Sequence, residues 1–457
     1  MRIVIPTTGS VGDLNPYVAL GVGLRAFGHE VRLATHADYE PTVRARGLDF
    51  FPIEEDARAF HAQEAGQRMF AAGANPFIFL REFVRLRQPR MAGLMARCLE
   101  ACRDADAIVG ASTALLIGQS VAEKLKIPFL SASLQPTTPT RFLVNSLFPP
   151  LPAWFPLAGI YNLASHVLVG EILWQLLGPA INKARTEVLG LPPFPFLGPL
   201  KVMRQIPVLH GYSATVVPRP GDWRTENHLT GFWFLKRPHD WRPAAELVDF
   251  LQAGPPPVYI GFGSMPNRHP QEVTALVVNA LKRAGQRGVL LTGWGGLGAG
   301  PKSDQVLLLE SVPHDWLFAR VRAVVHHGGA GTTAAALRAG VPSIVVPFMA
   351  DQPFWGGRVQ ALGVGPRPIP RKELTAPRLA EAIRTAVHDQ AMRRRAADLG
   401  RRLRAENGVA HAVGVIHRYL GVPDEPVVFS QSVRPVGDDS AHEALWRRTA
   451  AMIPTGS

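Results

Sequence analysis

The chain has 457 residues, 47% of them hydrophobic, and 49 basic against 36 acidic side chains give a net charge of +13. This length exceeds what one hydrophobic core usually holds, so two domains are expected. The basic residues are dispersed, and their one dense run, Arg393 to Arg404, has helical spacing without any visible nucleic-acid module. A solvated helix face is therefore favoured over a nucleic-acid or anionic-membrane partner.

The two cysteines, Cys98 and Cys102, lie one helical turn apart. This spacing suits neither a zinc site nor a disulfide framework, so we expect a buried pair in a reducing compartment. The N-terminus enters a strand pattern at once, RIVIP, without the pattern of a signal peptide. No run of about 18 apolar residues indicates a spanning helix, and a cytoplasmic protein is expected.

Buried-strand patterns alternate with helical patterns along both halves of the chain. The first half has strand patterns at 2–6, 30–35, 107–111 and 127–133, with helices expected over 16–28 and 115–126. The second half repeats the scheme, with strand patterns at 257–263, 288–293, 306–310, 323–327 and 342–347 and a helix over 271–285. The pattern predicts an α/β fold of two Rossmann-like, doubly wound parallel sheets facing across a cleft, with ligands beyond the carboxyl ends of the strands.

The expected domain boundary lies between Gln205 and Asp222, which gives an N-terminal domain of 1–210 and a C-terminal domain of 211–423. Between residues 141 and 191 the alternation fails, and an apolar, aromatic stretch broken by prolines indicates an inserted pair of helices. Three roles are compatible with this insert: it could line a pocket for an apolar ligand, contact a membrane surface, or only cover the sheet. The polar tail, 424–457, is expected to be loosely held.

A glycine-rich loop, HHGGAGTT at His326–Thr333, leads from a strand pattern into a helical one. Three glycines let backbone N–H groups approach an anion, two threonines add hydroxyl donors, and the helix start adds a positive dipole end. The loop therefore predicts a phosphate site rather than a plain helix cap. GFGS, which ends at Ser264, would lie at the same sheet edge and could donate to the same diphosphate.

Two acidic positions also follow strands. Asp351 and Gln352 follow SIVVPFMA, and a carboxylate beside a carboxamide suits adjacent sugar hydroxyls, although a surface turn before Pro353 is the simpler alternative. Asp13 lies in TTGSVGDLNP, which lacks the third glycine of a dinucleotide fingerprint. It either caps a helix that begins near Asn15 or acts as a general base. An aspartate is a useful base only if burial raises its pKa or if proton removal comes late.

These motifs resemble the nucleotide-sugar glycosyltransferases of the two-Rossmann-domain (GT-B) fold, family 1. The resemblance is to the bacterial branch that is similar to sterol glucosyltransferases and glycopeptide-antibiotic glucosyltransferases. Residues 9–36 look like the N-terminal signature of this family, 219–235 like its interdomain segment and 312–359 like its donor-binding signature. The resemblance extends from residue 1 to about residue 420.

The resemblance implies a role for individual positions. Asp13 would match the acidic residue proposed as base in the antibiotic-modifying members; the histidine that the plant branch uses in this loop is absent here. The donor diphosphate would contact Ser264, His327, Gly329, Gly331 and Thr332. The base and ribose would contact Trp294, Val312, Pro313 and His314, and the sugar would contact Asp351 and Gln352. The last helix before residue 423 would pack back on the N-terminal domain.

The resulting expectation is an inverting transfer of a hexose, glucose first, from a UDP- or TDP-sugar to a hydroxyl of a lipophilic acceptor such as a sterol, terpenoid or macrolide. It needs no bound cofactor, no metal and no nucleic acid, and the protein would be a monomer or weak dimer. The insert suggests an acceptor pocket that includes Phe142, Phe148, Trp154 and Trp174. Two alternatives are a nucleotide-sugar epimerase or lipid-linked precursor transferase on the same fold, and a non-catalytic lipid- or membrane-binding protein.

Overall fold

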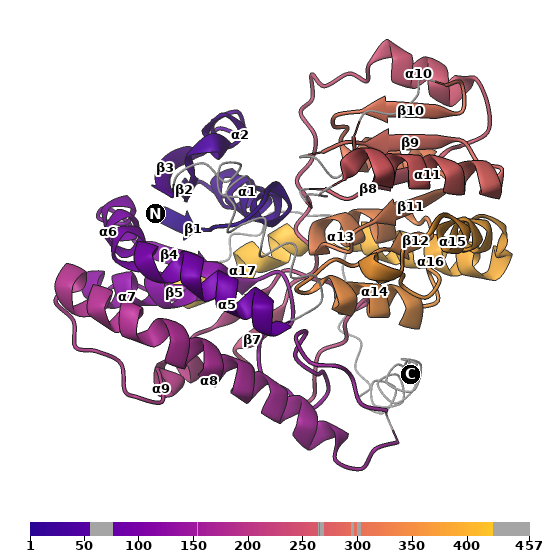
Figure 1. Ribbon diagram of the computed structural model, residues 1–457. Helices are drawn as coiled ribbons and strands as arrows, with labels where there is room; N and C mark the ends of the chain where they lie inside the picture. The colour runs from indigo at the N-terminus through magenta and orange to yellow at the C-terminus, as the bar shows by residue number, and fades with distance from the viewer. Residues whose placement is uncertain are drawn as a thin grey trace. The chain divides into compact units, whose positions relative to one another are not determined.

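The computed structural model describes residues 1–54, 76–152, 154–263, 265, 269–293, 297–298 and 303–423, which form two compact units (Figure 1). The first unit contains residues 1–54, 76–235 and 406–423 of the described chain, and the second contains 236–405. Each unit is built on one parallel sheet with helices packed against it. The predicted α/β class with two parallel sheets is therefore confirmed.

The first sheet has seven parallel strands in the order β3-β2-β1-β4-β5-β6-β7. Apolar runs such as Ala107–Ala111 are buried on both faces, as parallel sheets require. The direction in which successive strands are added reverses between β1 and β4. The strands are β1 (Arg2–Pro6), β2 (Glu30–His36), β3 (Asp49–Glu54), β4 (Ala107–Ala111), β5 (Phe129–Ser133), β6 (Val208–His210) and β7 (Asn227–Leu229).

The helices of the first unit include an unusually long one, α8, at its periphery (Figure 1). They are α1 (Val11–Ala26), α2 (Glu40–Arg44), α5 (Pro76–Arg87), α6 (Met91–Ala101), α7 (Leu115–Leu125), α8 (Ala158–Ala184), α9 (Leu200–Gln205) and α17 (Gly408–Leu420). Helix α17 packs against α1, and the Nε2 atoms of His29 and His417 lie 2.8 Å apart. The final helix thus belongs to the first unit.

The unit boundary differs from the sequence prediction. The chain passes from the first unit to the second at Leu235, not near residue 211. The reason is that β6 and β7, three residues each, continue the first sheet within a segment whose prolines and glycines suggested a linker. Their brevity hid the strand pattern.

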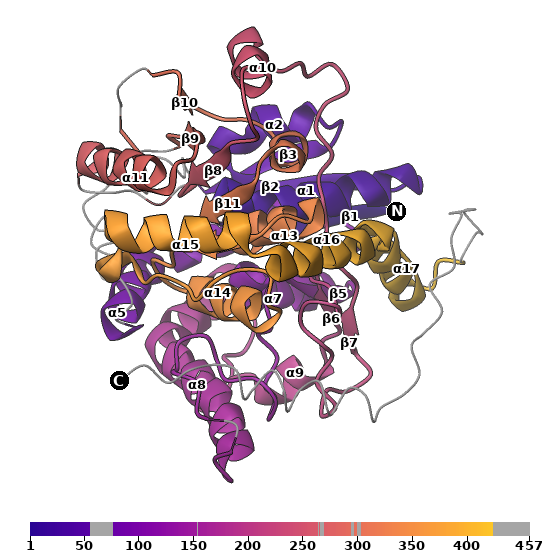
Figure 2. The ribbon, with the colours of Figure 1, turned by 90° about the vertical axis from the view of Figure 1, so that its right-hand side faces the viewer.

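The second sheet has five parallel strands in the order β10-β9-β8-β11-β12, which Figure 1 shows stacked in this order. They are β8 (Val258–Gly261), β9 (Gly288–Leu291), β10 (Val306–Leu309), β11 (Ala323–His326) and β12 (Ser343–Val345). The helices are α10 (Ala245–Gln252), α11 (Pro270–Ala284), α12 (His314–Leu317), α13 (Ala330–Ala339), α14 (Gln352–Ala361), α15 (Ala376–His388) and α16 (Gln390–Ala405). Figure 2 shows α15 and α16 following one another past α13. Here the strand order reverses between β8 and β11.

Two predictions about particular side chains can be compared with the packing. Cys98 and Cys102 are free thiols buried in the core of the first unit, as expected, and the hydrogen bond with Cys98, followed by burial, raises the pKa of Cys102. The arginines of α16 lie on its solvent side, while Leu399 and Leu403 face the core. The dense basic run is therefore a solvated helix face.

Candidate active site

The loop that follows β1 lies at the point where the first sheet reverses its strand order, which is where ligands bind in doubly wound folds. The Thr113 hydroxyl, which follows β4, donates to the Thr8 carbonyl across this point at 3.2 Å. The Arg87 guanidinium donates to the Thr8 hydroxyl at 2.9 Å. Neither Arg87 nor Thr113 could be predicted, because nothing in the sequence shows which distant segments reach this loop.

Asp13 caps helix α1. Its Oδ2 atom accepts hydrogen bonds from the Ser10 backbone N–H and from the Ser10 hydroxyl, both at 2.9 Å. The helix begins at Val11, earlier than the sequence suggested. Asp13 is its third residue, where the positive end of the helix dipole stabilises a carboxylate. The Asp13 side chain is exposed. The capping role is thus present, and the role as a base stays a prediction.

The glycine-rich loop occupies the equivalent place in the second unit, between β11 and α13 at the reversal of strand order. Gly329 is the N-cap of α13, so the first N–H groups of the helix open towards this loop. Fully buried His326 accepts the Gly328 N–H at Nδ1, 3.1 Å away, and burial holds its pKa well below the usual range. Thr333 is also buried, with its hydroxyl on the Gly329 carbonyl at 2.9 Å, and fixes the helix start.

The ring of His327 lies between two glycines. A Cβ atom added to Gly329 would lie 2.5 Å from the ring Nε2, and one added to Gly263 would lie 2.9 Å from Cε1. Burial, and secondarily the charge of His314, lowers the pKa of His327 to about 4, so the ring is neutral at pH 7. Its Nδ1 atom is buried and makes no hydrogen bond within the described chain. The two glycines thus hold the His327 ring in place.

The segment predicted to read the nucleotide base follows β10. Val312 and Pro313 are partly buried, and Pro313 is the N-cap of α12. His314 is packed inside the unit: its ring stacks on Phe318 with 4.4 Å between centroids, and its Nε2 lies 3.3 Å from the Tyr259 hydroxyl. Burial lowers the pKa of His314 to about 4. The side chain of His314 therefore supports the loop from within.

Asp351 and Gln352 begin α14 after Ala350, which takes a left-handed φ of 54°. The Trp355 indole donates to Asp351 Oδ2 at 2.9 Å. Gln352 is buried, and its Oε1 atom accepts the N–H groups of Phe348 and Met349 at 2.7 and 3.1 Å. The Gln352 side chain therefore holds the conformation of this loop. Asp351 is only half-buried. Ser264 and Trp294, two further predicted donor contacts, lie outside the described residues.

The four aromatic residues expected in the acceptor pocket have different surroundings. Trp174 belongs to the core of the first unit, and its indole donates to the Phe196 carbonyl at 2.7 Å. Phe148 contacts Tyr161 edge to face, and Trp154 contacts Phe155 with 80% of its surface exposed. Phe142 lies near Gly221.

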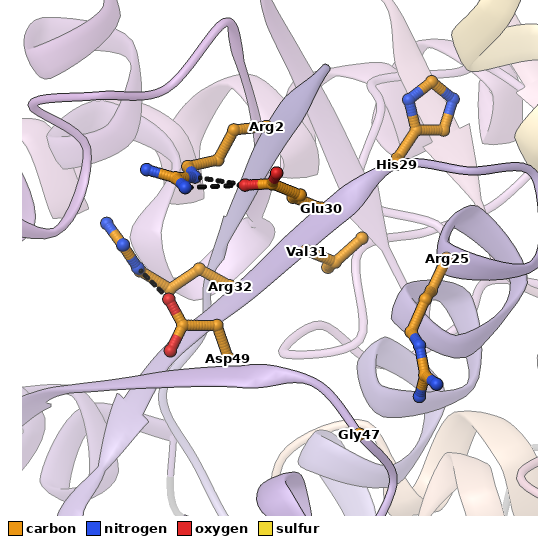
Figure 3. Close-up of a pocket in the computed structure, with 8 residues that line it drawn as sticks. All are labelled: Arg2, Arg25, His29, Glu30, Val31, Arg32, Gly47 and Asp49. Atoms are coloured by element: carbon orange, nitrogen blue, oxygen red, sulfur yellow. Dashed lines mark hydrogen bonds and ion pairs between the residues drawn. The ribbon is translucent and has the colours of Figure 1, made fainter.

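A cavity of about 370 Å³ lies at the opposite, amino-terminal edge of the first sheet (Figure 3). Its charged lining is paired internally: Arg2 with Glu30 at 2.6 Å, and Arg32 with Asp49 at 2.8 Å. The Arg32 guanidinium also bonds Asp104 and lowers the pKa of that carboxyl. An ion-pair network at the surface thus lines this cavity. It lies away from the carboxyl ends of the strands, where the predicted site lies.

Comparison with known proteins agrees with this arrangement. Residues 3–144 match the model of the glycosyltransferase family 28 N-terminal domain, and residues 298–415 match that of the erythromycin biosynthesis protein CIII-like C-terminal domain. Sterol 3-beta-glucosyltransferase UGT80A2 of Arabidopsis thaliana is 40% identical over 92% of this chain and 66% of its own length. UGT80B1 of the same plant, also a sterol 3-beta-glucosyltransferase, is 35% identical over 98% of this chain and 72% of its own length.

The chain belongs to the sterol glucosyltransferase-like family of glycosyltransferases. It spans about two thirds of the length of the Arabidopsis UGT80A2 protein and 30% of a sterol 3-beta-glucosyltransferase of Emericella nidulans, with which it is 37% identical over 92% of its own length. The family predicted from the motifs is confirmed.

Solved structures of glycosyltransferases share the fold of this family member. Glycosyltransferase VinC, solved in complex with DTDP, aligns with a TM-score of 0.62 and 18% identity over 93% of this chain and 100% of its own. The spinosyn rhamnosyltransferase SpnG, solved with spinosyn aglycone, gives 0.58 and 19% over 91% and 100%. These likenesses and the two parallel sheets confirm the predicted GT-B fold.

Proposed function

We propose that this glycosyltransferase moves glucose from UDP-glucose or TDP-glucose to a hydroxyl of a sterol or similar lipophilic acceptor, with inversion at the anomeric carbon. One observation carries the proposal. The glycine-rich loop stands at the reversal point of the second sheet, with a partly buried, neutral His327 beside the start of α13, in a chain related to sterol glucosyltransferases. Two structural neighbours, one solved with DTDP and one with spinosyn aglycone, support the same two substrate classes.

The donor half of the reaction needs a place for a departing diphosphate. Backbone N–H groups of the first turn of α13, those of Ala330, Gly331 and Thr332, would stabilise the negative charge that grows on the diphosphate oxygens. The neutral ring of His327 would add an N–H donor without adding a charge. Asp351 would accept from sugar hydroxyls. We propose that these donors, rather than a metal ion, neutralise the leaving group, and unchanged turnover in EDTA would support this.

The acceptor half needs a base. In the proposed step the acceptor oxygen attacks the anomeric carbon, the bond from that carbon to the diphosphate breaks, and the acceptor proton passes to Asp13. The two hydrogen bonds from Ser10 both reach Oδ2, and they fix the direction of the carboxylate. Because Asp13 is exposed rather than buried, proton transfer late in the reaction, when the sugar is already cationic, is the mechanism that we favour.

Asp13→Asn tests the base. We expect kcat to fall about 100-fold or more, within the range that general base catalysis contributes, with UDP binding unchanged. Full activity would remove Asp13 from the mechanism. Ser10→Ala is the matched variant for the cap: it keeps the carboxylate but loses one donor, so we expect a much smaller loss.

Product analysis by mass spectrometry separates the two alternative functions. With UDP-glucose, TDP-glucose and a panel of sterols and macrolides, we expect glucosylated acceptor. An isomerised nucleotide sugar formed without acceptor would favour an epimerase. No turnover of any donor, together with vesicle binding, would favour a non-catalytic lipid-binding protein.

We also propose that the first half of α8 contacts a membrane surface. Its exposed side chains are apolar at helical spacing, and residues 158–170 contain no Lys, Arg, Asp or Glu. Among the described residues, one continuous helical stretch, Ala158–Leu189, is long and apolar enough to span a membrane, although a single such helix is weak evidence for a span. The exposed apolar residues are Trp154, Phe155, Leu157, Ile160, Val167 and Leu168. Exposed Arg141, whose Cβ approaches Gly159, lies beside this face and suits an anionic headgroup.

Vesicle flotation tests the membrane contact. A Leu157→Ser/Ile160→Ser/Val167→Ser variant should lose binding to vesicles of mixed zwitterionic and anionic lipid while keeping UDP affinity. Binding that survives these substitutions would contradict the proposal. A concentration-dependent dimer of the wild type that the substitutions abolish would assign the same face to a second copy instead.

A further inference from the structure

The loop before α1 turns at Gly9, whose φ of 137° lies in the region that favours glycine. A Cβ atom at this position would lie 2.6 Å from Asp13 Oδ2, so the carboxylate approaches the backbone where only glycine leaves room. Because glycine adopts many conformations, the peptide unit between Gly9 and Ser10 needs other contacts to fix its orientation.

That peptide unit is held at both of its polar atoms. The Tyr39 hydroxyl donates to the Gly9 carbonyl oxygen at 3.1 Å, and the Ser10 N–H at the other end of the same peptide donates to Asp13 Oδ2 at 2.9 Å. The hydroxyl, the peptide and the carboxylate thus form one chain of hydrogen bonds, in which each bond polarises the next. Rotation of this one peptide would break both bonds.

The preceding peptide unit is held by His36. The Gly9 N–H donates to His36 Nε2 at 3.2 Å, which requires the tautomer without a proton on Nε2. The rings of His36 and Tyr39 meet edge to face, with centroids 5.9 Å apart, and both side chains are buried. They come from the end of β2 and from the 3-10 turn Ala37–Tyr39, next to β1 in the sheet.

We infer that Tyr39 and His36 are positioning residues for Asp13: they clamp the two peptide units around Gly9, and through the Ser10 N–H they set the direction of the Asp13 carboxylate. The catalytic consequence rests on the proposed function of Asp13 as base. The existence of the clamp does not depend on that function, and it can be measured without turnover.

Tyr39→Phe removes the hydroxyl and leaves the ring. Losing one neutral hydrogen bond would lower kcat about 3- to 10-fold with both KM values unchanged. Amide hydrogen exchange at Gly9 and Ser10 should become faster by a similar factor. Tyr419→Phe is the matched control, since its hydroxyl bonds His228 at 3.1 Å on the surface of the same unit, and we expect no change in kcat or in these two amides.

His36 is tested with two substitutions of different chemistry. His36→Phe keeps an aromatic ring without the acceptor and should reproduce the effect of Tyr39→Phe. In His36→Gln a carboxamide oxygen can accept the Gly9 N–H, so it should recover most of the activity and of the protection from exchange.

The outcomes separate this inference from the proposed function. Unchanged exchange at Ser10 in Tyr39→Phe overturns the inference, whatever the activity. If Asp13→Asn is inactive, Tyr39→Phe with wild-type kcat also overturns it, and the base assignment stands. If Asp13→Asn is fully active, the base assignment fails, and exchange alone decides whether the clamp exists. In an Asp13→Asn background, Tyr39→Phe should lower the remaining activity no further.

Discussion

Replacing Gly329 by alanine tests whether a fixed His327 ring holds the donor. The backbone of Gly329, with φ −60° and ψ 145°, suits alanine, so the effect is steric rather than conformational. The new Cβ atom would lie 2.5 Å from His327 Nε2, well inside the ordinary contact limit of 3.4 Å, and the backbone of Gly263 approaches the ring from another side. The ring must therefore turn away from its present position.

The expected loss of UDP affinity follows from the hydrogen bond between the His327 ring and the diphosphate that would be lost. A donor to a charged diphosphate oxygen contributes about 1.5–3 kcal/mol, so we expect UDP to bind about 10- to 150-fold more weakly. Isothermal titration calorimetry measures this directly, with Gly357→Ala as control because a Cβ on Gly357 meets nothing within 4 Å. Wild-type affinity in Gly329→Ala, with the fold intact by circular dichroism, would refute the role of the His327 ring.

Three further predictions follow from burial and pKa. Because the pKa of His327 is about 4, UDP affinity should change less than about twofold between pH 7 and 8, whereas a requirement for a cationic ring with an ordinary pKa near 6.5 would weaken binding severalfold over that interval. Because the pKa of His314 is about 4, this side chain binds fewer protons in the folded than in the unfolded state between pH 6.5 and 4. The free energy of unfolding, measured by urea titration, should therefore decrease as the pH is lowered from 6.5 to 4, and it should decrease less steeply in His314→Gln. Trp174→Ala should lower the free energy of unfolding by about 3–5 kcal/mol, and exposed Trp154→Ala by less than about 0.5 kcal/mol; equal losses would contradict their different burial.

The sequence predicted the long-range plan of the fold because parallel strands buried on both faces appear as short apolar runs. β1, β4, β8 and β11 all lie where these runs stand. β3, Asp49–Glu54, was missed because acidic residues at both ends leave only a short apolar run, which Pro52 interrupts. β6 and β7 were missed because they are three residues long.

The candidate site was predictable where one loop carries it and not where distant segments meet. The donor loop could be found because its glycines and threonines are consecutive. The contact of Gly263 with His327 follows from the pairing of β8 with β11, and those of Tyr39 and His36 with Gly9 from the pairing of β1 with β2. For Trp174 the sequence left both surroundings open, since an aromatic residue in an apolar insert is as well suited to a core as to a pocket, and its side chain packs in the core of the first unit.

The anomeric configuration of the product tests the central claim most directly. The protein would be incubated with UDP-glucose, in which the anomeric bond is α, and a sterol, and the purified product examined by proton NMR. The proposed single displacement, with Asp13 as base and the diphosphate leaving into the glycine-rich loop, predicts a β-glucoside that Asp13→Asn forms about 100-fold or more slowly. An α-glucoside, or the same β-glucoside formed at an undiminished rate by Asp13→Asn, would contradict it.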